Sequence, residues 1–197
     1  MYGSLQMKDD LTSRLNKIIE RLESTELIEN KGLGNEIGFY IFDYPPEEEL
    51  RIRDYIKFIL DHLGKKRPDL RIMHINLFEL IVTYLQNRNL LDNALKLQRD
   101  KGDDAMRKAL AGPLHEEKIA KAFLEAAQPL DHDIVIMSGI GNAWPLLRSH
   151  TLLNNLHPLM QNTPLVVFYP GVYNGQDLSL FGKLGDNNYY RAFRLVP

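Results

Sequence analysis

Two short, unbroken apolar runs limit the folds open to this chain: residues 133–137 (DIVIM) and residues 165–169 (LVVFY). Runs so rich in β-branched and aromatic residues, without polar alternation, are typical of strands buried on both faces of a sheet. Glycine, proline and polar residues bound each run, so neither continues into a helix-length pattern. The chain is therefore expected to build on a parallel sheet joined by helical crossovers.

Three further segments have the composition of strands, and helical patterns lie between them. The other strands are expected at residues 37–43 (IGFYIFD), 70–76 (LRIMHIN) and 189–196, the last at a sheet edge. Helical spacing predicts helices over about residues 8–24, 45–63 and 145–156. Alternating strands and helices predict an α/β fold with a mainly parallel five-stranded sheet and helices on both faces.

Residues 77–128 separate the second and third expected strands and contain no convincing strand. Glycine and proline divide them into helical pieces near residues 77–88, 90–100, 103–110 and 115–127. One helix suffices for a crossover between parallel strands, so this stretch is an enlarged helical connection or insertion. No linker or repeat divides the chain, and residues 1–197 are expected to form a single domain.

The composition excludes several kinds of site. The chain has no cysteine, which excludes disulfide scaffolds, thiolate zinc sites, iron–sulfur clusters and cysteine nucleophiles. Its net charge of -2 offers no global attraction for polyanions. The N-terminal segment lacks a signal pattern and no apolar run reaches membrane-spanning length, so a cytoplasmic location is expected.

The carboxyl ends of parallel strands are where such folds bind ligands, so the residues after each strand are candidates for a site. Asp43 and Tyr44 follow the first expected strand, and Asp43 is the best-placed carboxylate for acid–base chemistry. Because Pro45 and Pro46 suit the start of a helix, the favoured interpretation makes Asp43 the cap of that helix.

The loop after the third expected strand, residues 138–145 (SGIGNAWP), carries two glycines. They could expose backbone N–H groups to an anion beside Ser138, Asn142 and Trp144. However, the dinucleotide fingerprint needs a third glycine, and the phosphate loop G-x-x-x-x-G-K-[ST] is absent from the chain. A tight strand-to-helix turn is therefore favoured, with Pro145 starting the helix and Trp144 packing on a neighbour.

Residues 169–177 (YPGVYNGQD) contain Pro-Gly and Asn-Gly, two pairs that favour turns. Tyr169, Tyr173 and Asn174 are expected on an exposed loop that either contacts a partner or only shapes the turn. Tyrosines on such a loop have the amphipathic character of interface anchors.

Residues 186–194 interleave aromatic residues with arginine, and Tyr190 and Arg191 are candidates for contact with a partner or ligand. Aromatic and arginine side chains can stack on bases and bind phosphates. Two arginines beside Asp186 are too small an electrostatic footprint, so direct nucleic-acid binding is not expected.

The histidines form no metal-binding pattern. Residues 131–133 (DHD) would point to alternate faces of a strand, and His115 lacks the second histidine of H-E-x-x-H. His150 and His157 are about two helical turns apart, with Pro158 disturbing the end. No metal or other cofactor is expected, and the lack of a complete catalytic motif predicts that the protein is not an enzyme.

Two long motifs resemble the BrxB family of BREX phage-defence systems. The first is residues 32–46 (GLGNEIGFYIFDYPP), followed by a helix with Arg and Tyr. The second is residues 168–176 (FYPGVYNGQ) with residues 180–184 (LFGKL) and 188–195 (NYYRAFRL). The order of elements matches along nearly the whole chain, whereas residues 77–128 are not diagnostic. The fold that the resemblance implies is a P-loop-NTPase-like or Rossmann-like sheet without a phosphate loop.

The resemblance also implies a component of a bacterial defence island that methylates host DNA and blocks phage replication. Its companions include a methyltransferase (PglX), a phosphatase-like protein (PglZ), an ATPase (BrxC) and a small DNA-binding protein (BrxA), and PglZ is the partner most suggested. We therefore expect a non-catalytic adaptor that docks PglZ. Two alternatives stay open: an enzyme of unfamiliar type, dependent on a nucleotide or metal, and a nucleic-acid-binding module.

Overall fold

A computed structural model describes residues 2–30, 38–185 and 192–196 of the chain. The strands described are β1 (Phe39–Tyr44), β2 (Ile72–Asn76), β3 (Ile134–Ser138), β4 (Leu165–Tyr173), β5 (Leu178–Leu180), β6 (Leu184–Gly185) and β7 (Phe193–Arg194). The helices described are α1 (Tyr2–Leu22), α2 (Thr25–Ile28), α3 (Glu49–Lys66), α4 (Leu77–Asn87), α5 (Leu91–Lys101), α6 (Asp103–Leu110), α7 (Glu116–Ala127), α8 (Ile140–Ala143) and α9 (Ser149–Leu156), with 3₁₀ turns η1 (Pro46–Glu48) and η2 (Pro129–Asp131).

Five strands run parallel in the order β2-β3-β4-β1-β7, which confirms the expected mainly parallel sheet. After β1 the chain crosses to the outer edge at β2 and then returns through β3 and β4 to the side of β1. The β1–β4 ladder runs from Phe39 opposite Leu165 to Tyr44 opposite Pro170. This crossing leaves β1 inside the sheet, where helices can cover it from both sides.

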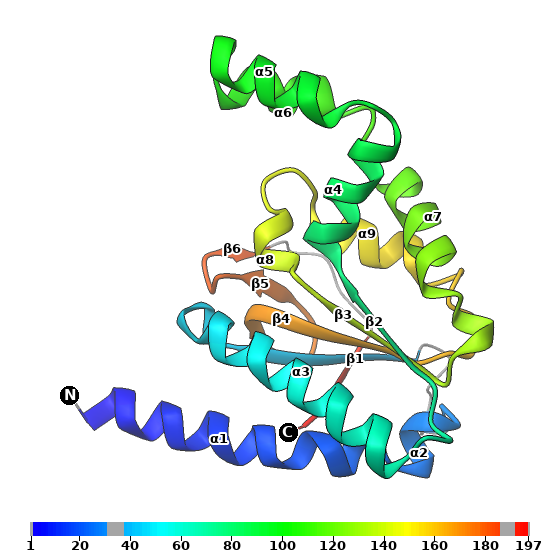
Figure 1. Ribbon diagram of the computed structural model, residues 1–197. Coiled ribbons are helices and arrows are strands. Elements are labelled where there is room, and N and C mark those ends of the chain that lie inside the picture. The colour runs from blue at the N-terminus through cyan, green and yellow to red at the C-terminus, as the bar shows by residue number, and fades with distance from the viewer. Residues whose placement is uncertain (1, 31–37, 186–191, 197) are drawn as a thin grey trace.

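Helices cover both faces of the sheet, as Figure 1 shows. α1, α2 and α3 pack on one face, and α4, α7, α8 and α9 pack on the other. Val135 and Met137 of β3 contribute to the core under α4, α7 and α9, whereas Ile134 and Ile136 contribute to the core under α1 and α3. Because successive side chains of a strand point to opposite faces, a strand between two cores must be apolar at every position.

The connection between β2 and β3 consists of four helices, as expected, with bounds within a residue or two of those predicted. α4 and α7 pack on the body of the protein, while α5 and α6 (residues 91–110, the helical arm) project away from it (Figure 1). Ala94 is the buried residue of α5, and Leu110 is that of α6. The helical arm therefore buries little apolar surface within this chain.

Several expected boundaries are wrong. The helix expected to start at Pro45 begins as η1 and becomes α3 at Glu49, and α9 begins at Ser149 instead of Pro145. The edge strand expected over residues 189–196 is described only as β7, because residues 186–191 lie outside the described part of the chain.

The largest difference is that β4 does not stop at Tyr169 but continues to Tyr173 and pairs antiparallel with β5. Pro170 has no N–H to donate, but its carbonyl still accepts from Phe181 N at 2.9 Å. Gly171 is required because a Cβ there would lie 2.1 Å from the carbonyl oxygen of Ser179. The pairs Pro-Gly and Asn-Gly had predicted a loop, whereas the structure uses Pro-Gly inside a strand.

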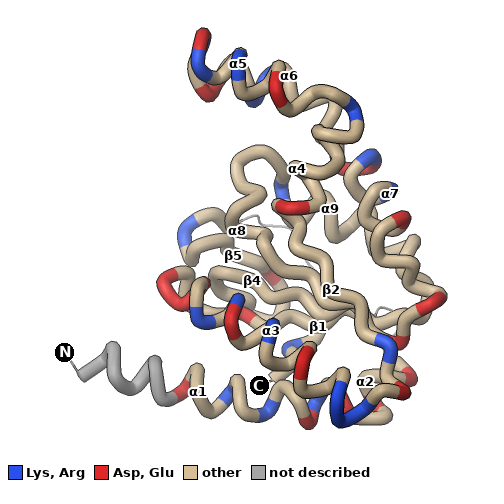
Figure 2. The backbone as a smooth tube through the Cα atoms, in the orientation of Figure 1, with Lys and Arg blue, Asp and Glu red and all other residues tan. Residues whose placement is uncertain are grey.

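Charged residues of both signs are interspersed over the helices, while the sheet carries few of them (Figure 2). Among the described residues, no helix combines the length and the apolar character needed to cross a lipid bilayer.

Replacement of Gly171 by alanine tests the strand extension. Gly171→Ala is expected to lower the free energy of unfolding by about 1–3 kcal/mol, because backbone must move to admit the new methyl group. Gly64→Ala is the matched control: the position is exposed in α3 with nothing within 4 Å, so alanine should stabilise by about 0.5–1 kcal/mol. Urea unfolding measures both, and equal effects in the two variants would contradict the strand extension.

Candidate interaction surface

Asp43 lies at the carboxyl end of β1 and is buried in a network instead of capping a helix. Its Oδ1 accepts from Arg14 Nη2 at 2.7 Å, and its Oδ2 accepts from the backbone N–H of Tyr173 at 3.0 Å. Arg194 lies 3.5 Å from the same carboxylate. The expected cap role is wrong, because Asp43 is a strand residue whose oxygens hold together α1, β4 and β7.

Tyr44 joins a second chain of hydrogen bonds, which links α3 to α8. Its hydroxyl donates to Glu49 Oε2 at 2.6 Å, and Arg53 donates both to Glu49 Oε1 at 2.9 Å and to Asn142 Oδ1 at 2.7 Å. Burial, and then the neighbouring Glu49 carboxylate, raise the pKa of Tyr44 well above its usual value. Tyr44 therefore stays a neutral donor, and two sequence candidates, Tyr44 and Asn142, are joined by structural bonds.

The glycines after β3 are explained by close packing. Gly139 has φ +73°, and a Cβ there would lie 2.0 Å from Oδ1 of Asn76, which caps α4 by accepting from the N–H groups of Phe78 and Glu79. At Gly141 a Cβ would lie 3.0 Å from Pro170 and 3.1 Å from Phe181. The expected tight turn is present, but it leads directly into α8.

Ser138 is 5% exposed and forms a pair that the sequence did not reveal. Its Oγ lies 2.8 Å from Nε2 of His74, on the neighbouring strand β2. Burial lowers the pKa of His74, against the opposing effect of the Glu79 charge. The only sequence signal for this pair is that both residues lie near the ends of expected strands. Their contact depends on the register of β2 against β3.

The prediction that Tyr169 and Tyr173 lie on an exposed loop is wrong. Tyr169 and Tyr173 are 1% and 0% exposed within β4, and the Tyr173 hydroxyl donates to the carbonyl of Ala192 at 2.6 Å. Asn174 does form a turn, since its Oδ1 accepts from Gln176 N at 2.8 Å and Asp177 N at 2.7 Å. Tyrosines here belong to the core because β4 continues where the sequence predicted a turn.

These features fill part of the crevice at the strand ends. The turn after β1 contains Pro45 and Pro46, which have no N–H to offer an anion. Pro170 of β4 and Phe181, which follows β5, both lie close to Gly141 of α8. A smaller pocket of about 340 Å³ remains beside Asp43 and Tyr44. Among the described residues, no three His, Asp or Glu side chains are grouped to hold a metal ion.

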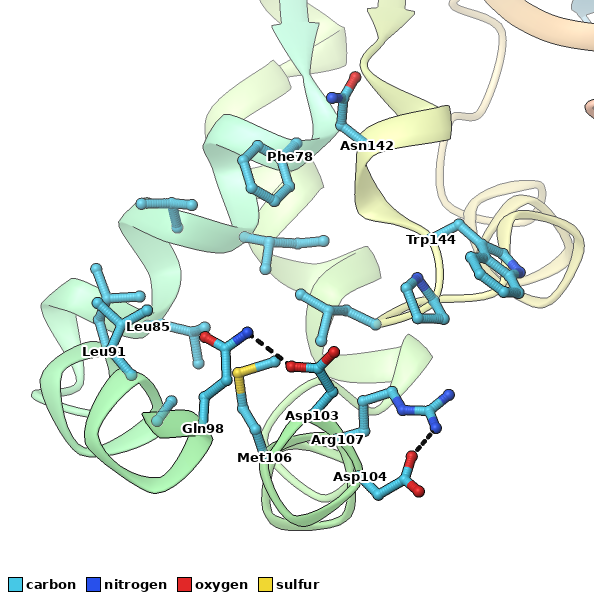
Figure 3. Close-up of a pocket in the computed structure, with 16 residues that line it drawn as sticks. Phe78, Leu85, Leu91, Gln98, Asp103, Asp104, Met106, Arg107, Asn142 and Trp144 are labelled. Atoms are coloured by element: carbon cyan, nitrogen blue, oxygen red, sulfur yellow. Dashed lines mark hydrogen bonds and ion pairs between the residues drawn. The ribbon is translucent and has the colours of Figure 1, made fainter. Parts of the chain in front are cut away.

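A larger pocket, of about 750 Å³, lies between α4, the helical arm and residues 142–146. We call it the apolar groove (Figure 3). Phe78 of α4, Leu95 of α5 and Trp144 are 37%, 43% and 42% exposed at its margin. Its remaining lining residues are Ile81, Val82, Leu85, Leu91, Ala94, Gln98, Asp103, Asp104, Met106, Arg107, Asn142, Pro145 and Leu146.

The apolar groove brings together two of the sequence candidates, Trp144 and Asn142. Trp144 was expected to pack on a neighbour, but much of its side chain is exposed. Tyr190 and Arg191, the remaining candidates, lie outside the described residues. Sequence reasoning missed Phe78, Leu95 and Met106, because in a helical pattern an apolar residue at a groove resembles one in the core.

Comparison with known proteins gives consistent matches. The family model for BREX protein BrxB matches residues 73–195, more than half of the chain and including the helical arm. A BREX protein BrxB of Escherichia coli O9:H4 (strain HS) is 43% identical over 187 residues, covering 95% of this chain and 92% of the relative. One of Bacillus cereus (strain H3081.97) is 40% identical over 190 residues, covering 94% and 97%. No solved structure matches.

Removal of the Asp43 carboxylate is expected to lower the free energy of unfolding. Side-chain exposure is 10% for Asp43 and 15% for Arg14, so Asp43→Ala leaves a largely buried cation unpaired and should destabilise the protein by about 3–5 kcal/mol. In the control, Asp69→Ala breaks the exposed pair with Arg67 and should cost at most about 1 kcal/mol. Urea unfolding at neutral pH measures both, and an Asp43→Ala cost as small as the control would contradict this role.

His74 should make stability depend on pH. Burial lowers its pKa in the folded state, so the unfolded chain binds a proton near pH 6.5 while the folded protein resists it. Its contribution is complete above that pH and is lost as the pH falls toward the lower folded-state pKa. Urea unfolding at pH 7.5 and 5.5 should show a smaller loss of stability for His74→Gln than for the unsubstituted protein. Identical losses in the two proteins would show that His74 does not contribute to the dependence of stability on pH.

Proposed function

Since the chain belongs to the BrxB family of BREX proteins, we propose that it acts as a non-catalytic adaptor that docks the phosphatase-like PglZ component. Family membership makes it a component of a BREX antiviral defence system that works with other BREX proteins. In the proposal, docking holds PglZ in the assembly that supports host DNA methylation and phage resistance.

The observation that carries the proposal is the apolar groove with its exposed margin. Contiguous apolar surface that a folded protein leaves exposed marks an interaction site, because water contact with it is unfavourable. Phe78, Leu95 and Trp144 provide such surface from three separate elements. An adaptor needs a contact surface of this kind and no reaction centre.

The polar side chains at the strand ends, which are bonded to other parts of the chain, support the same proposal. Asp43, Tyr44, Ser138 and Asn142 each hold another part of the same chain at hydrogen-bonding distance. Side chains that join parts of the fold in this way contribute to its stability. Direct nucleic-acid binding is not part of the proposal, since Arg194 lies 3.5 Å from the Asp43 carboxylate and basic and acidic residues alternate along the helices (Figure 2).

One observation favours a second candidate function, an enzyme of unfamiliar type. The hydroxyl of Ser138 and the imidazole of His74 are at the distance expected of a nucleophile and its base. Two observations count against this candidate. Ser138 is 5% exposed, which leaves little room for a substrate at its hydroxyl. Glu79, the acid beside His74, accepts a hydrogen bond from the Asn76 side chain at 3.2 Å and so helps to hold the start of α4.

Co-expression tests the adaptor proposal. A tagged form of the chain, produced with the other BREX components of its own system, should retain PglZ through affinity purification and gel filtration at gentle salt. The tag alone is the control for non-specific capture. Recovery of the chain without PglZ would contradict the docking role.

Phage plating separates the two candidate functions. For an adaptor, Ser138→Ala should keep both PglZ capture and phage restriction, because the hydroxyl only pairs with His74. For an enzyme that uses the pair, the same variant should keep capture and lose restriction. Thermal melting confirms that the variant is folded in either case.

A further inference from the structure

We infer that the apolar groove receives one amphipathic helix of the partner subunit, with its apolar face in the groove and a Lys or Arg beside that face. This inference rests on the proposed docking function. It adds the place of the contact and the chemistry of the segment that binds there.

The helical arm indicates that something else covers the groove. Ala94 and Leu110 are the buried residues of its two helices, while Leu91 and Met106 are half-buried and Leu95 is 43% exposed. An amphipathic helix is stabilised mainly by packing its apolar face, and this chain covers that face only in part. A partner that fills the groove would complete the packing of the arm.

The walls of the groove favour a helix as the occupant. Its described lining residues come from α4, α5, α6, α8 and the turn that follows α8, and Figure 3 shows Phe78, Met106 and Trp144 on different walls. No strand edge lies among them, so an added β-strand would find no ladder of backbone groups. Proline-rich segments dock on grooves lined by aromatic rings, whereas Phe78 and Trp144 are the only aromatic residues among the described lining residues.

The charges at the groove indicate what accompanies the apolar face. Arg107 forms an ion pair with Asp104, whereas Asp103 accepts a hydrogen bond from the neutral amide of Gln98 at 2.9 Å (Figure 3). The charged residues that line the groove are therefore two acids, Asp103 and Asp104, and one base, Arg107. A Lys or Arg of the partner would be attracted to Asp103, and an acidic segment would be repelled.

Matched substitutions of exposed residues test the site. Phe78→Ala and Leu95→Lys alter the groove, while Phe58→Ala and Leu50→Lys make the same changes at exposed positions of α3, on the other face of the sheet. Affinity for PglZ should fall about tenfold or more for the groove variants and change less than about twofold for the controls. Unchanged circular dichroism and melting temperature establish that each variant is folded.

The variant Asp103→Asn tests whether the negative charge of Asp103 attracts the partner. The control is Asp100→Asn, which removes the same charge from an exposed position that does not line the groove. Asp103→Asn should weaken binding and flatten its dependence on salt, because it removes an attraction that salt screens. The control should keep the salt dependence of the unsubstituted chain. Equal salt dependence in both variants would overturn the cationic part of the inference.

A photo-crosslinker at position 78, introduced as Phe78→p-benzoylphenylalanine, identifies the occupant. The expected crosslink joins a segment of PglZ with apolar residues at helical spacing and a nearby Lys or Arg. A crosslink to a second copy of this chain, or to an extended segment, would overturn the inference.

The outcomes separate the inference from the proposed function. If the unsubstituted chain captures PglZ and the groove variants capture it equally well, the groove assignment is wrong and the docking function stands. If the unsubstituted chain captures no BREX component, both are wrong.

Discussion

The parallel pairing of β1 with β4 is the constraint on which the rest of the structure depends. Its ladder joins segments from opposite ends of the chain, from Phe39 opposite Leu165 to Tyr44 opposite Pro170. It puts β1 inside the sheet, so that helices must cover both of its faces. At its carboxyl end it also brings Asp43 to the backbone N–H of Tyr173, which ties the last part of β4 to the first strand.

That continuation of β4 decides what the usual ligand site of an α/β sheet can do here. In such sheets the ends of the strands are open and bind ligands. In this protein β4 runs past the edge, and Pro170 and Phe181 pack against Gly141. Polar side chains at the strand ends join elements of the fold, and the larger apolar groove lies farther out, where the helical arm meets α4 and Trp144.

An interaction surface built from a helical insertion has a physical advantage for an adaptor. Most residues of the two cores lie outside the helical arm, which contributes only Ala94 and Leu110 of the described buried residues to one of them. Changes at exposed positions of the arm, such as Leu95, can therefore alter binding with little effect on the core. The family model includes this region, although the sequence pattern of residues 77–128 is not diagnostic by itself.

Local patterns in the sequence determined the presence and order of the strands β1 to β4, the four helices of the insertion and the absence of a phosphate loop, but not where β4 ends. These depend on periodicity, turn residues and motifs, which are read along the chain. Tertiary structure alone decided that Tyr169 and Tyr173 are core residues, that Ser138 meets His74, and that a groove forms. Each of these depends on strand register or on how separate helices pack, and such contacts join residues far apart in the sequence.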